Sequence, residues 1–421
     1  MTLVKERPET VEEQAILAKK AAKKLSALTT EDKNEALHII ADELIQDYKY
    51  ILEANREDLK NGKEKGFEEA YMDRLALSKE RIEDFANGLR EVAKLSDPTG
   101  DILSEWTLEN GLNVKTVRVP LGVIGMIYEA RPNVTADATG LALKSGNAIV
   151  LKGGSSAIFS NKAIVEVMHR ALEKTKIPKE AVQFIASTER EATKQLFTMK
   201  EHIDVLIPRG GGSLIRAVVN NATVPVLETG VGNCHLYFDK DADVNKALSI
   251  LINAKTDRPA VCNAAETLLV HKDWLKENHQ VLQETLEKNN IQIHGDDRIV
   301  QLMKGAAPAN ESDWENEYLS LAIAIRVVDS LDEAVDHIDQ YGTKHSEAII
   351  TENKETAEAF MRLVDAAALY HNASTRFTDG GALGFGAEIG ISTQKLHARG
   401  PMGLPALTTV KYMMLGNGQI R

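Results

Sequence analysis

The chain has 421 residues, with 50 lysines and arginines against 62 aspartates and glutamates, and a formal net charge of −12. A protein that binds nucleic acid by neutralising phosphates is expected to carry net positive charge or a basic stripe, so this class is excluded. No stretch approaches the ~18 uninterrupted apolar residues of a membrane span, and no apolar signal-peptide core follows the N-terminal basic residues. We therefore expect a cytoplasmic enzyme of two or three domains, at roughly 150 residues per domain.

The first hundred residues are predicted to be helical scaffold. Leu37, Ile40 and Leu44 recur at spacings of three and four, which is typical of a helix with one buried face. Thr30 is expected to cap a helix that starts with two acidic residues. The charge-dense stretch 56–65 could be an interaction surface, but a solvated helix face is the better interpretation.

From residue 114 onward, short β-branched runs alternate with helical patterns. An apolar strand within residues 119–130 is followed by a helix that ends near Lys144 and by the strand 148–152. The alternation continues with predicted strands at 182–186 and 205–208 and with helices that begin at Ala157 and Glu189. Repeated βαβ units predict a parallel, doubly wound sheet that binds its ligand at the carboxyl ends of the strands.

A second α/β region is predicted from Asn233 onward. Cys234, Leu236 and Phe238 alternate with polar residues, which predicts a half-buried strand. A helix follows from Val244, before Pro259, and further strands are expected at 267–271, 322–328 and 348–351, ahead of a glycine-rich segment at 379–403.

The two cysteines differ in their expected roles. They are too few for a disulfide framework or a thiolate metal cluster, so we expect no metal site. Cys234 is expected to point to the apolar face of its strand and to be a small core residue. Cys262 lies three residues after Pro259, in a turn between a helix and a strand, where a side chain can be presented to a cleft. It is the candidate nucleophile.

Two glycine-rich loops each follow a predicted strand. Residues 210–213 could let the backbone approach a phosphate or a nicotinamide at a helix N-terminus, or could form a simple turn, because the GxGxxG spacing is absent. The loop from Lys152 to Ser156 is similar, and Lys152 suits an anionic ligand unless it is merely solvated.

Basic residues are frequent near these loops and near the glycine-rich segment. A cleft that they line would concentrate an anionic substrate despite the negative net charge, although any single one could be ordinary surface. The set comprises Arg209, Arg258, Arg376, Lys395, His397 and Arg399.

Longer motifs carry a resemblance that spans nearly the whole chain. YEARPNVTAD, LKGGSS, PRGGGSLI, AKTDRPAVCNAAETLLV, NASTRFTDGG and STQKLHARGPMG closely resemble the γ-glutamyl phosphate reductase family, within the aldehyde dehydrogenase superfamily. The resemblance implies an aldehyde-dehydrogenase-like α/β fold. It implies a Rossmann-type cofactor domain over 1–103 and 119–232, a catalytic domain over 233–400, and a β-flap with a tail over 104–118 and 401–421 that forms a homo-oligomer.

The resemblance also implies a reaction, the NADPH-dependent reduction of L-glutamyl 5-phosphate to glutamate 5-semialdehyde and phosphate in proline biosynthesis. Cys262 falls on the family's nucleophile and Asn133 on its oxyanion-hole asparagine. Lys152 and Ser155 fall on contacts to the cofactor ribose and 2′-phosphate, Gly211, Gly212 and Ser213 on the loop beside the pyrophosphate and nicotinamide, and Glu317 on the glutamate that binds the nicotinamide ribose. Arg258, Arg376, Lys395, His397 and Arg399 are the candidates for binding the substrate's anionic groups.

Some questions stay open at this stage. Glu228 lies 34 residues before Cys262, where hydrolytic relatives keep a general base, but a phosphorylating enzyme needs no activated water. Arg258 is a candidate for lowering the pKa of the Cys262 thiol, by sequence proximity only. The alternatives are a cofactor-independent hydrolase or acyltransferase that uses Cys262, and a nucleotide sensor in a complex with glutamate 5-kinase, the candidate partner.

Overall fold

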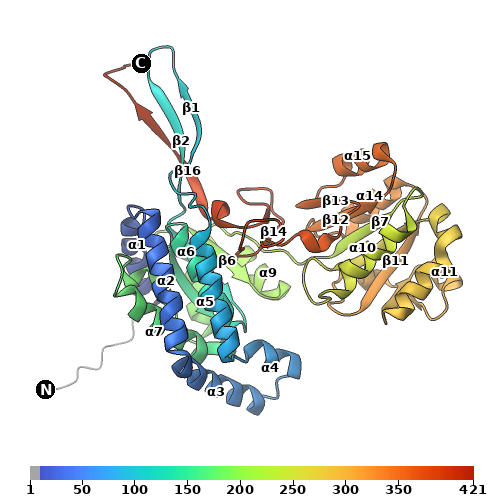
Figure 1. Ribbon diagram of the computed structural model, residues 1–421, viewed down its shortest axis with the longest axis horizontal. Coiled ribbons are helices and arrows are strands. Elements are labelled where there is room, and N and C mark those ends of the chain that lie inside the picture. The colour runs from blue at the N-terminus through green and yellow to red at the C-terminus, as the bar shows by residue number, and fades with distance from the viewer. Residues whose placement is uncertain (1–9) are drawn as a thin grey trace. The chain divides into compact units, whose positions relative to one another are not determined.

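A computed structural model describes residues 10–421. The chain forms two compact units (Figure 1). Unit 1 comprises residues up to 228 together with 385–390 and 402–421, and unit 2 comprises 229–384 and 391–401. Residues 385–390 therefore belong to unit 1, whereas the sequence-based division placed all of 233–400 in one domain.

Five helices open unit 1, where the sequence predicts helical scaffold. Their apolar positions are buried, as in α2, where Leu37, Ile40 and Leu44 are fully buried. The helices are α1 (Val11–Leu25), α2 (Thr30–Gln46), α3 (Tyr48–Glu64), α4 (Glu69–Leu75) and α5 (Lys79–Lys94).

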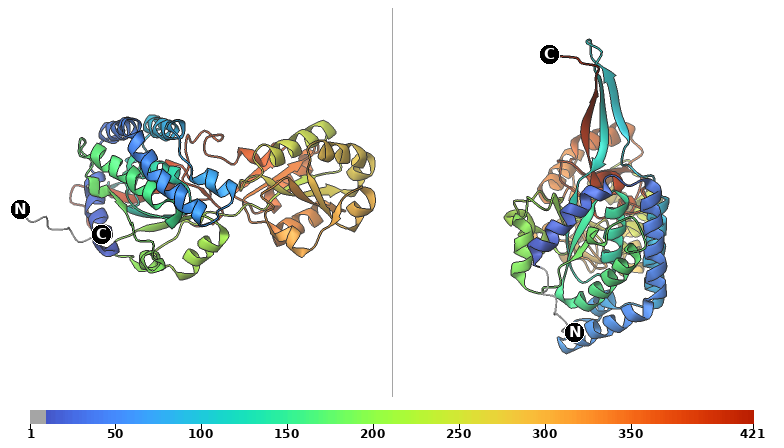
Figure 2. Two further views of the ribbon diagram at one scale, coloured as in Figure 1. Left: turned by 90° about the horizontal axis from the view of Figure 1, so that it is seen from below. Right: turned by 90° about the vertical axis from the view of Figure 1, so that its left-hand side faces the viewer.

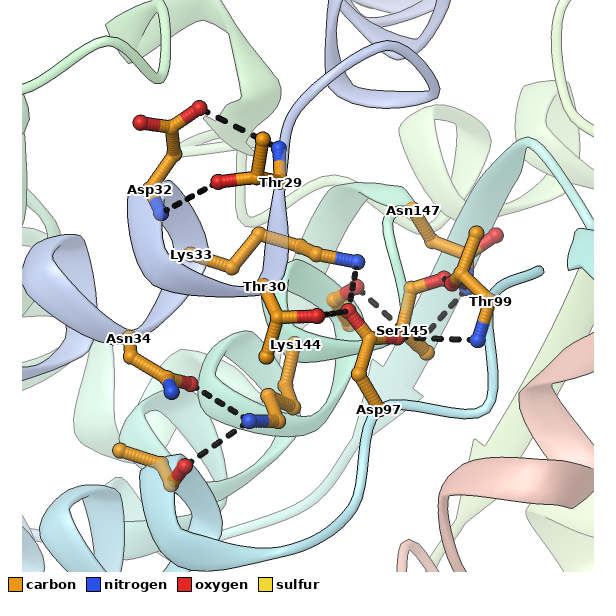
Figure 3. Close-up of polar contacts among 12 residues, drawn as sticks. Thr29, Thr30, Asp32, Lys33, Asn34, Asp97, Thr99, Lys144, Ser145 and Asn147 are labelled. Atoms are coloured by element: carbon orange, nitrogen blue, oxygen red, sulfur yellow. Dashed lines mark hydrogen bonds and ion pairs between the residues drawn. The ribbon is translucent and has the colours of Figure 1, made fainter. Parts of the chain in front are cut away.

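The start of α2 differs from the prediction by one residue. Thr29, not Thr30, is the N-cap: its side chain accepts a hydrogen bond from the Asp32 N–H, and the Asp32 carboxylate accepts one from the Thr29 N–H, each 3.2 Å long (Figure 3). Thr30 instead donates its hydroxyl to Asp97 over 3.0 Å. The prediction for Thr30 is wrong because only the residue three before Asp32 can form this reciprocal pair.

A four-stranded parallel sheet forms the centre of unit 1, in the order β5-β4-β3-β6. Every residue of β3 and β4 is buried, so both faces of the sheet are covered. The strands are β3 (Val123–Tyr128), β4 (Ala148–Gly153), β5 (Val182–Phe184) and β6 (Val205–Arg209), and the helices between and after them are α6 (Pro132–Lys144), α7 (Ile158–Leu172), α8 (Arg190–Thr198) and α9 (Gly212–Asn221).

Buried lysines anchor α6 at its C-terminal end. Lys144 is fully buried, and its ammonium donates to the Ala93 carbonyl over 2.8 Å and to the Asn34 side chain (Figure 3). Nearby, the buried Lys33 forms an ion pair with Asp97. These charge-assisted bonds join α6 to α2 and to the end of α5, so the helix that begins beside Asn133 has a fixed far end.

Three antiparallel strands form a separate ribbon of unit 1, in the order β1-β2-β16. They are β1 (Ile102–Thr107), β2 (Asn113–Pro120) and β16 (Thr408–Leu415). Figure 1 and the right-hand view of Figure 2 show the ribbon extending away from the helices of unit 1. Trp106, Tyr412 and Met414 are among its exposed apolar side chains.

A seven-stranded parallel sheet forms the core of unit 2, in the order β10-β9-β11-β8-β7-β12-β13. The strands are β7 (Cys234–Phe238), β8 (Ala265–His271), β9 (Gln292–Gly295), β10 (Ala307–Pro308), β11 (Ala322–Val328), β12 (Ser346–Ile350) and β13 (Ala368–His371). The helices are α10 (Val244–Thr256), α11 (Lys272–Lys288), α12 (Asp297–Leu302), α13 (Glu311–Glu315), α14 (Leu331–Tyr341) and α15 (Lys354–Leu363), and a short pair, β14 (Ile391–Ser392) and β15 (Gly400–Pro401), completes the unit.

The prediction that β7 is half-buried is wrong. All five of its residues are buried, because β7 lies between β8 and β12 near the middle of the sheet and both of its faces are covered. The polar members of the alternation find internal partners: His235, for example, donates its backbone N–H to the buried Glu347. In residues 10–421, no helix is long and apolar enough to cross a membrane.

The capping pair at the start of α2 predicts a stability difference. Thr29→Ala removes the side-chain acceptor, so we expect the free energy of unfolding to fall by about 1 kcal/mol, measured by chemical denaturation. Thr29→Ser retains a hydroxyl and should lose much less. Equal stabilities of the alanine and serine variants would contradict this assignment of the cap.

Candidate active site

Cys262 lies in unit 2 in the loop between α10 and β8 and is half-buried. Its carbonyl oxygen accepts a hydrogen bond from the Cys234 thiol over 3.2 Å. The backbone of Gly232 lies so close that a β-carbon there would be 1.4 Å from this same oxygen. No other residue type fits position 232 without moving the Cys262 backbone.

The segment 375–378 fixes the loop from its other side. Thr375 donates its hydroxyl to the Asn263 carbonyl over 2.7 Å, and the Asn263 amide donates to the Thr378 carbonyl over 2.9 Å. The predicted anion-binding residue Arg376 also lies here, bonded to the Asn263 side chain and, over 2.9 Å, to Asp257. Residues on both sides of Cys262 are therefore tied to Arg376 and its neighbours.

Cys234 has the buried position expected of a core residue. It is fully buried, and burial raises the pKa of its thiol well above the ordinary value. The neighbouring His345 ring is also fully buried, which lowers its pKa to about 4 and keeps it neutral near pH 7. Its Nδ1 lies 2.8 Å from the Ser346 hydroxyl, which in turn contacts the Thr378 hydroxyl at 2.6 Å. Cys234 thus belongs to a series of buried polar side chains next to the Cys262 loop.

Glu317 lies near the same loop. Its carboxylate accepts a hydrogen bond from the Gly232 N–H over 2.6 Å, and burial raises its pKa above the ordinary value. Glu266, which the sequence analysis did not single out, accepts from the backbone N–H groups of Tyr318 and Leu319 over 3.1 and 3.4 Å. Glu266 also forms a fully desolvated ion pair with Lys255 at 2.7 Å.

The other predicted basic residues of unit 2 fall into two places. Lys395 and Arg399 both bind Asp365, each over 2.8 Å, and these contacts hold the pKa of that carboxyl well below its usual range. His397 is exposed on the same segment, with a φ of 66°. Arg258 is exposed on the Cys262 loop. The structure therefore brings Lys395 and Arg399 together around a carboxylate.

Apart from Glu317, the predicted cofactor residues lie in unit 1. Lys152 is the last residue but one of β4, is buried, and donates to the neighbouring Gly153 carbonyl over 3.0 Å, while burial lowers its pKa. Ser155 follows on an exposed turn. Gly211, the N-cap of α9, is exposed, and its N–H donates to the Glu129 carboxylate over 3.1 Å. Glu129 was missed because nothing in its local sequence indicates that it faces a loop 82 residues later.

Asn133 lies in the first turn of α6, one residue after Pro132, which starts the helix. Its side-chain amide donates to Asp137, one turn further on, over 3.1 Å. This contact uses one of the two amide N–H groups and orients the other. Glu228 is half-buried at the end of unit 1.

The catalytic and cofactor candidates are thus divided between the units. Asn133, Lys152, Ser155 and residues 211–213 belong to unit 1, whereas Cys262 and Glu317 belong to unit 2. One α/β unit presents a cysteine on a loop whose backbone is held in place, and the other has a glycine-rich turn between a strand and a helix. Together these features define a class of protein, which comparison with known proteins identifies.

The model of the aldehyde dehydrogenase family matches residues 2–302, and the chain belongs to this family. Gamma-glutamyl phosphate reductase 2 of Bacillus licheniformis is 69% identical over 411 residues, which cover 98% of this chain and 97% of that protein. Gamma-glutamyl phosphate reductase of Bacillus cereus is 56% identical, with coverage of 96% and 98%. The crystal structure of gamma-glutamyl phosphate reductase from Thermotoga maritima has a TM-score of 0.97 and 50% identity, covering 98% of this chain and 100% of that chain. The resemblance seen in the motifs and the aldehyde-dehydrogenase-like α/β fold are confirmed.

The contact between Gly232 and Cys262 predicts a loss of activity on a small substitution. Gly232→Ala places a β-carbon on a backbone oxygen that no side-chain rotation can move, so we expect kcat/KM to fall by about 100-fold or more, as for a displaced reacting group. The circular dichroism spectrum of the variant is the control, since a wild-type spectrum separates a displaced Cys262 backbone from a failure to fold. Wild-type turnover by Gly232→Ala would contradict the proposed constraint.

Proposed function

We propose that this chain reduces L-glutamyl 5-phosphate to glutamate 5-semialdehyde and inorganic phosphate with NADPH, through a thioester on Cys262. The observation that supports this most is the 69% identity to a gamma-glutamyl phosphate reductase over 98% of the chain. The aligned residues cover 98% of the chain, so the similarity extends over both units.

In this proposal the Cys262 thiolate attacks the acyl carbon of the substrate and expels phosphate. Division of the reduction into thioester formation and thioester reduction replaces one difficult step by two easier ones. The rigid loop supports this role, because a nucleophile gains rate when it is positioned before the reaction. Cys234 is not the nucleophile, since its buried thiol stays protonated.

The side-chain amide of Asn133 stabilises the negative oxygen of each tetrahedral intermediate. Its orientation by Asp137 supports this assignment, because a preorganised donor needs no rearrangement when charge develops. Loss of one such donor typically lowers the rate by about 10²- to 10³-fold.

The residues of unit 1 fit a dinucleotide. The exposed N-terminus of α9 offers backbone N–H groups to a pyrophosphate, and a β-carbon at Gly211 would meet only Glu129, at 4.0 Å, so the turn is open. Lys152 and Ser155 would contact the ribose and its 2′-phosphate, Gly212 and Ser213 would lie beside the pyrophosphate and nicotinamide, and Glu317 would bind the nicotinamide ribose. When bound, NADPH supplies the hydride.

Binding of the substrate's phosphate is assigned to the basic residues of unit 2, which are Arg258, Arg376, Lys395, His397 and Arg399. Lys395 and Arg399 already share Asp365, so an anion there replaces an existing carboxylate partner. A hydrolase with a Cys–His pair is the weaker alternative, because His345 lies beside the buried Cys234 and its lowered pKa, about 4, makes it a weak base.

The reverse reaction tests the proposed function. Glutamate 5-semialdehyde with NADP⁺ should give reduced cofactor, followed by absorbance, only when inorganic phosphate is present. Cys262→Ala should abolish this turnover while its circular dichroism spectrum and NADP⁺ binding remain.

The other outcomes of this assay are informative. Turnover without phosphate would mean that water accepts the acyl group, with Glu228 as the base. Full activity of Cys262→Ala would contradict the thioester, and absence of turnover in every condition would contradict the proposed function.

The β1-β2-β16 ribbon is proposed as the surface through which copies of this chain associate. Tyr412 and Met414 lie two residues apart on one face of β16, and their side chains are 60% and 62% exposed. In a monomer this apolar surface would stay in contact with water, which costs free energy. The double variant Tyr412→Asp with Met414→Asp should lower the mass measured by light scattering, whereas Thr409→Asp, on the other face, should not. A monomeric wild-type chain, or an unchanged mass, would contradict this.

A further inference from the structure

A recess in unit 1 adjoins Asn133 and has a volume of about 470 Å³, within the usual range for small-ligand sites. Its walls come from the end of α4, the link to α5, the first turns of α5 and the start of α6. Three arginines and three aspartates line it, together with apolar surface from Leu77, Phe85 and Pro132. Balanced charges beside an apolar wall are unusual for a site that binds a simple anion.

We propose that this recess binds the α-amino and α-carboxylate groups of the substrate, an inference that rests on the proposed function. Arg74 binds the carboxylate, Asp84 and Asp137 bind the ammonium group, and the apolar wall contacts the methylene chain. Nothing in the chain's motifs pointed to Arg74 or Asp84.

The available partners support this division. The Arg81 guanidinium is already hydrogen-bonded within the wall of the recess. It donates to the Asp73 and Ala76 carbonyls, both over 2.6 Å, and to the Asp73 carboxylate over 2.8 Å. Arg74 makes no side-chain hydrogen bond or ion pair with any residue that the structure describes, and neither does Asp84. Arginine is the side chain best suited to a carboxylate, and an ammonium group offers three donors to carboxylates.

Asp137 connects the recess to the reacting end of the substrate. One carboxylate oxygen accepts from Asn133 over 3.1 Å, and Asp137 also lines the recess. Asp137 is exposed, but the atoms around its carboxyl reduce its hydration and raise its pKa to about 6. In glutamyl phosphate, three carbon–carbon bonds, roughly 4 Å, separate the acyl carbon from the α-carbon. A substrate whose carbonyl lies at Asn133 therefore reaches this recess with its head group.

The charge balance argues against the phosphate as the occupant. A phosphate dianion would lie among Asp73, Asp84 and Asp137, and like charges at such distances repel. An amino-acid head group carries one charge of each sign, so it pairs with both kinds of side chain.

The test uses the full chain in the oxidative direction, with NADP⁺, phosphate and three aldehydes: glutamate 5-semialdehyde, 5-oxopentanoate, which lacks the amino group, and pentanal, which lacks both groups. Arg74→Gln should lower kcat/KM for the first two by about 10- to 100-fold and leave pentanal within about twofold, as for a lost charged hydrogen bond. Asp84→Asn should lower only the value for glutamate 5-semialdehyde.

Matched controls lie on α5 outside the recess. Arg90→Gln and Glu83→Gln remove surface pairs with Asp42 and Lys79 and should leave all three substrates unaffected. Where pentanal turnover is too slow, competitive inhibition by L-glutamine, which carries the same head group, provides the comparison, and it should weaken in both recess variants.

Equal losses for all three aldehydes in Arg74→Gln, no loss at all, or a rise in the KM for phosphate alone would overturn the proposal. The wild-type chain separates the two hypotheses. If it oxidises glutamate 5-semialdehyde with phosphate and the recess variants behave in one of those ways, only the recess assignment fails. If the wild type shows no such turnover, the proposed function and the recess assignment fail together.

Discussion

The backbone of Gly232 determines where the proposed nucleophile lies. Because glycine has no side chain, the Cys262 carbonyl oxygen can lie where the β-carbon of any other residue at position 232 would be. The Gly232 N–H donates a hydrogen bond to the Glu317 carboxylate. One glycine therefore contacts both the loop that presents the thiol and the carboxylate assigned to the nicotinamide ribose. Gly232 makes both contacts with backbone atoms, the Cys262 loop is met through its own backbone, and only Glu317 contributes a side-chain atom. Such preorganisation is what a covalent mechanism requires.

Buried charges fix the surroundings of this glycine. Removal of two charges from water is costly, and such a pair is retained only where its geometry and further hydrogen bonds compensate. Glu266 meets this condition, since it pairs with Lys255 and accepts two backbone N–H groups from the segment that follows Glu317. In unit 1, Lys144 with its two acceptors fixes the C-terminal end of α6, whose first turn carries Asn133, and Lys33 pairs with Asp97 nearby. Each unit thus uses desolvated lysines to hold the element that carries a predicted site residue.

Local patterns predicted the elements well and the contacts between them poorly. The strands at 148–152, 205–208 and 322–328 were visible because buried parallel strands are continuous apolar runs. The alternation in Cys234–Phe238 was misleading, because the polar side chains of β7 find buried partners inside the sheet: the His235 ring lies 3.2 Å from Glu347, and the Tyr237 hydroxyl donates to Asp239. Gly232, Glu129, Asp137 and Glu266 were missed because their roles depend on partners that only the tertiary fold brings close. Cys262 and Asn133 were proposed from motifs, whereas Arg74 and Asp84 lie in a helical stretch that resembles ordinary scaffold.

Charge pairing decides which basic residues can recognise an anion. The basic residues near the glycine-rich segment looked suitable by number, yet Lys395 and Arg399 share Asp365, and Arg376 is bonded to Asp257 and Asn263. An anion that binds there must displace a carboxylate from its basic partner. The gain in binding free energy is therefore the difference between two ion-pair energies, not the energy of one ion pair. Arg74 has no such competitor among the described residues, and the carboxylates beside it suit a ligand with its own positive charge. If the recess binds the substrate as proposed, selectivity for an amino-acid head group over other anions follows from Arg74 and Asp84, which line the same recess without being paired with each other.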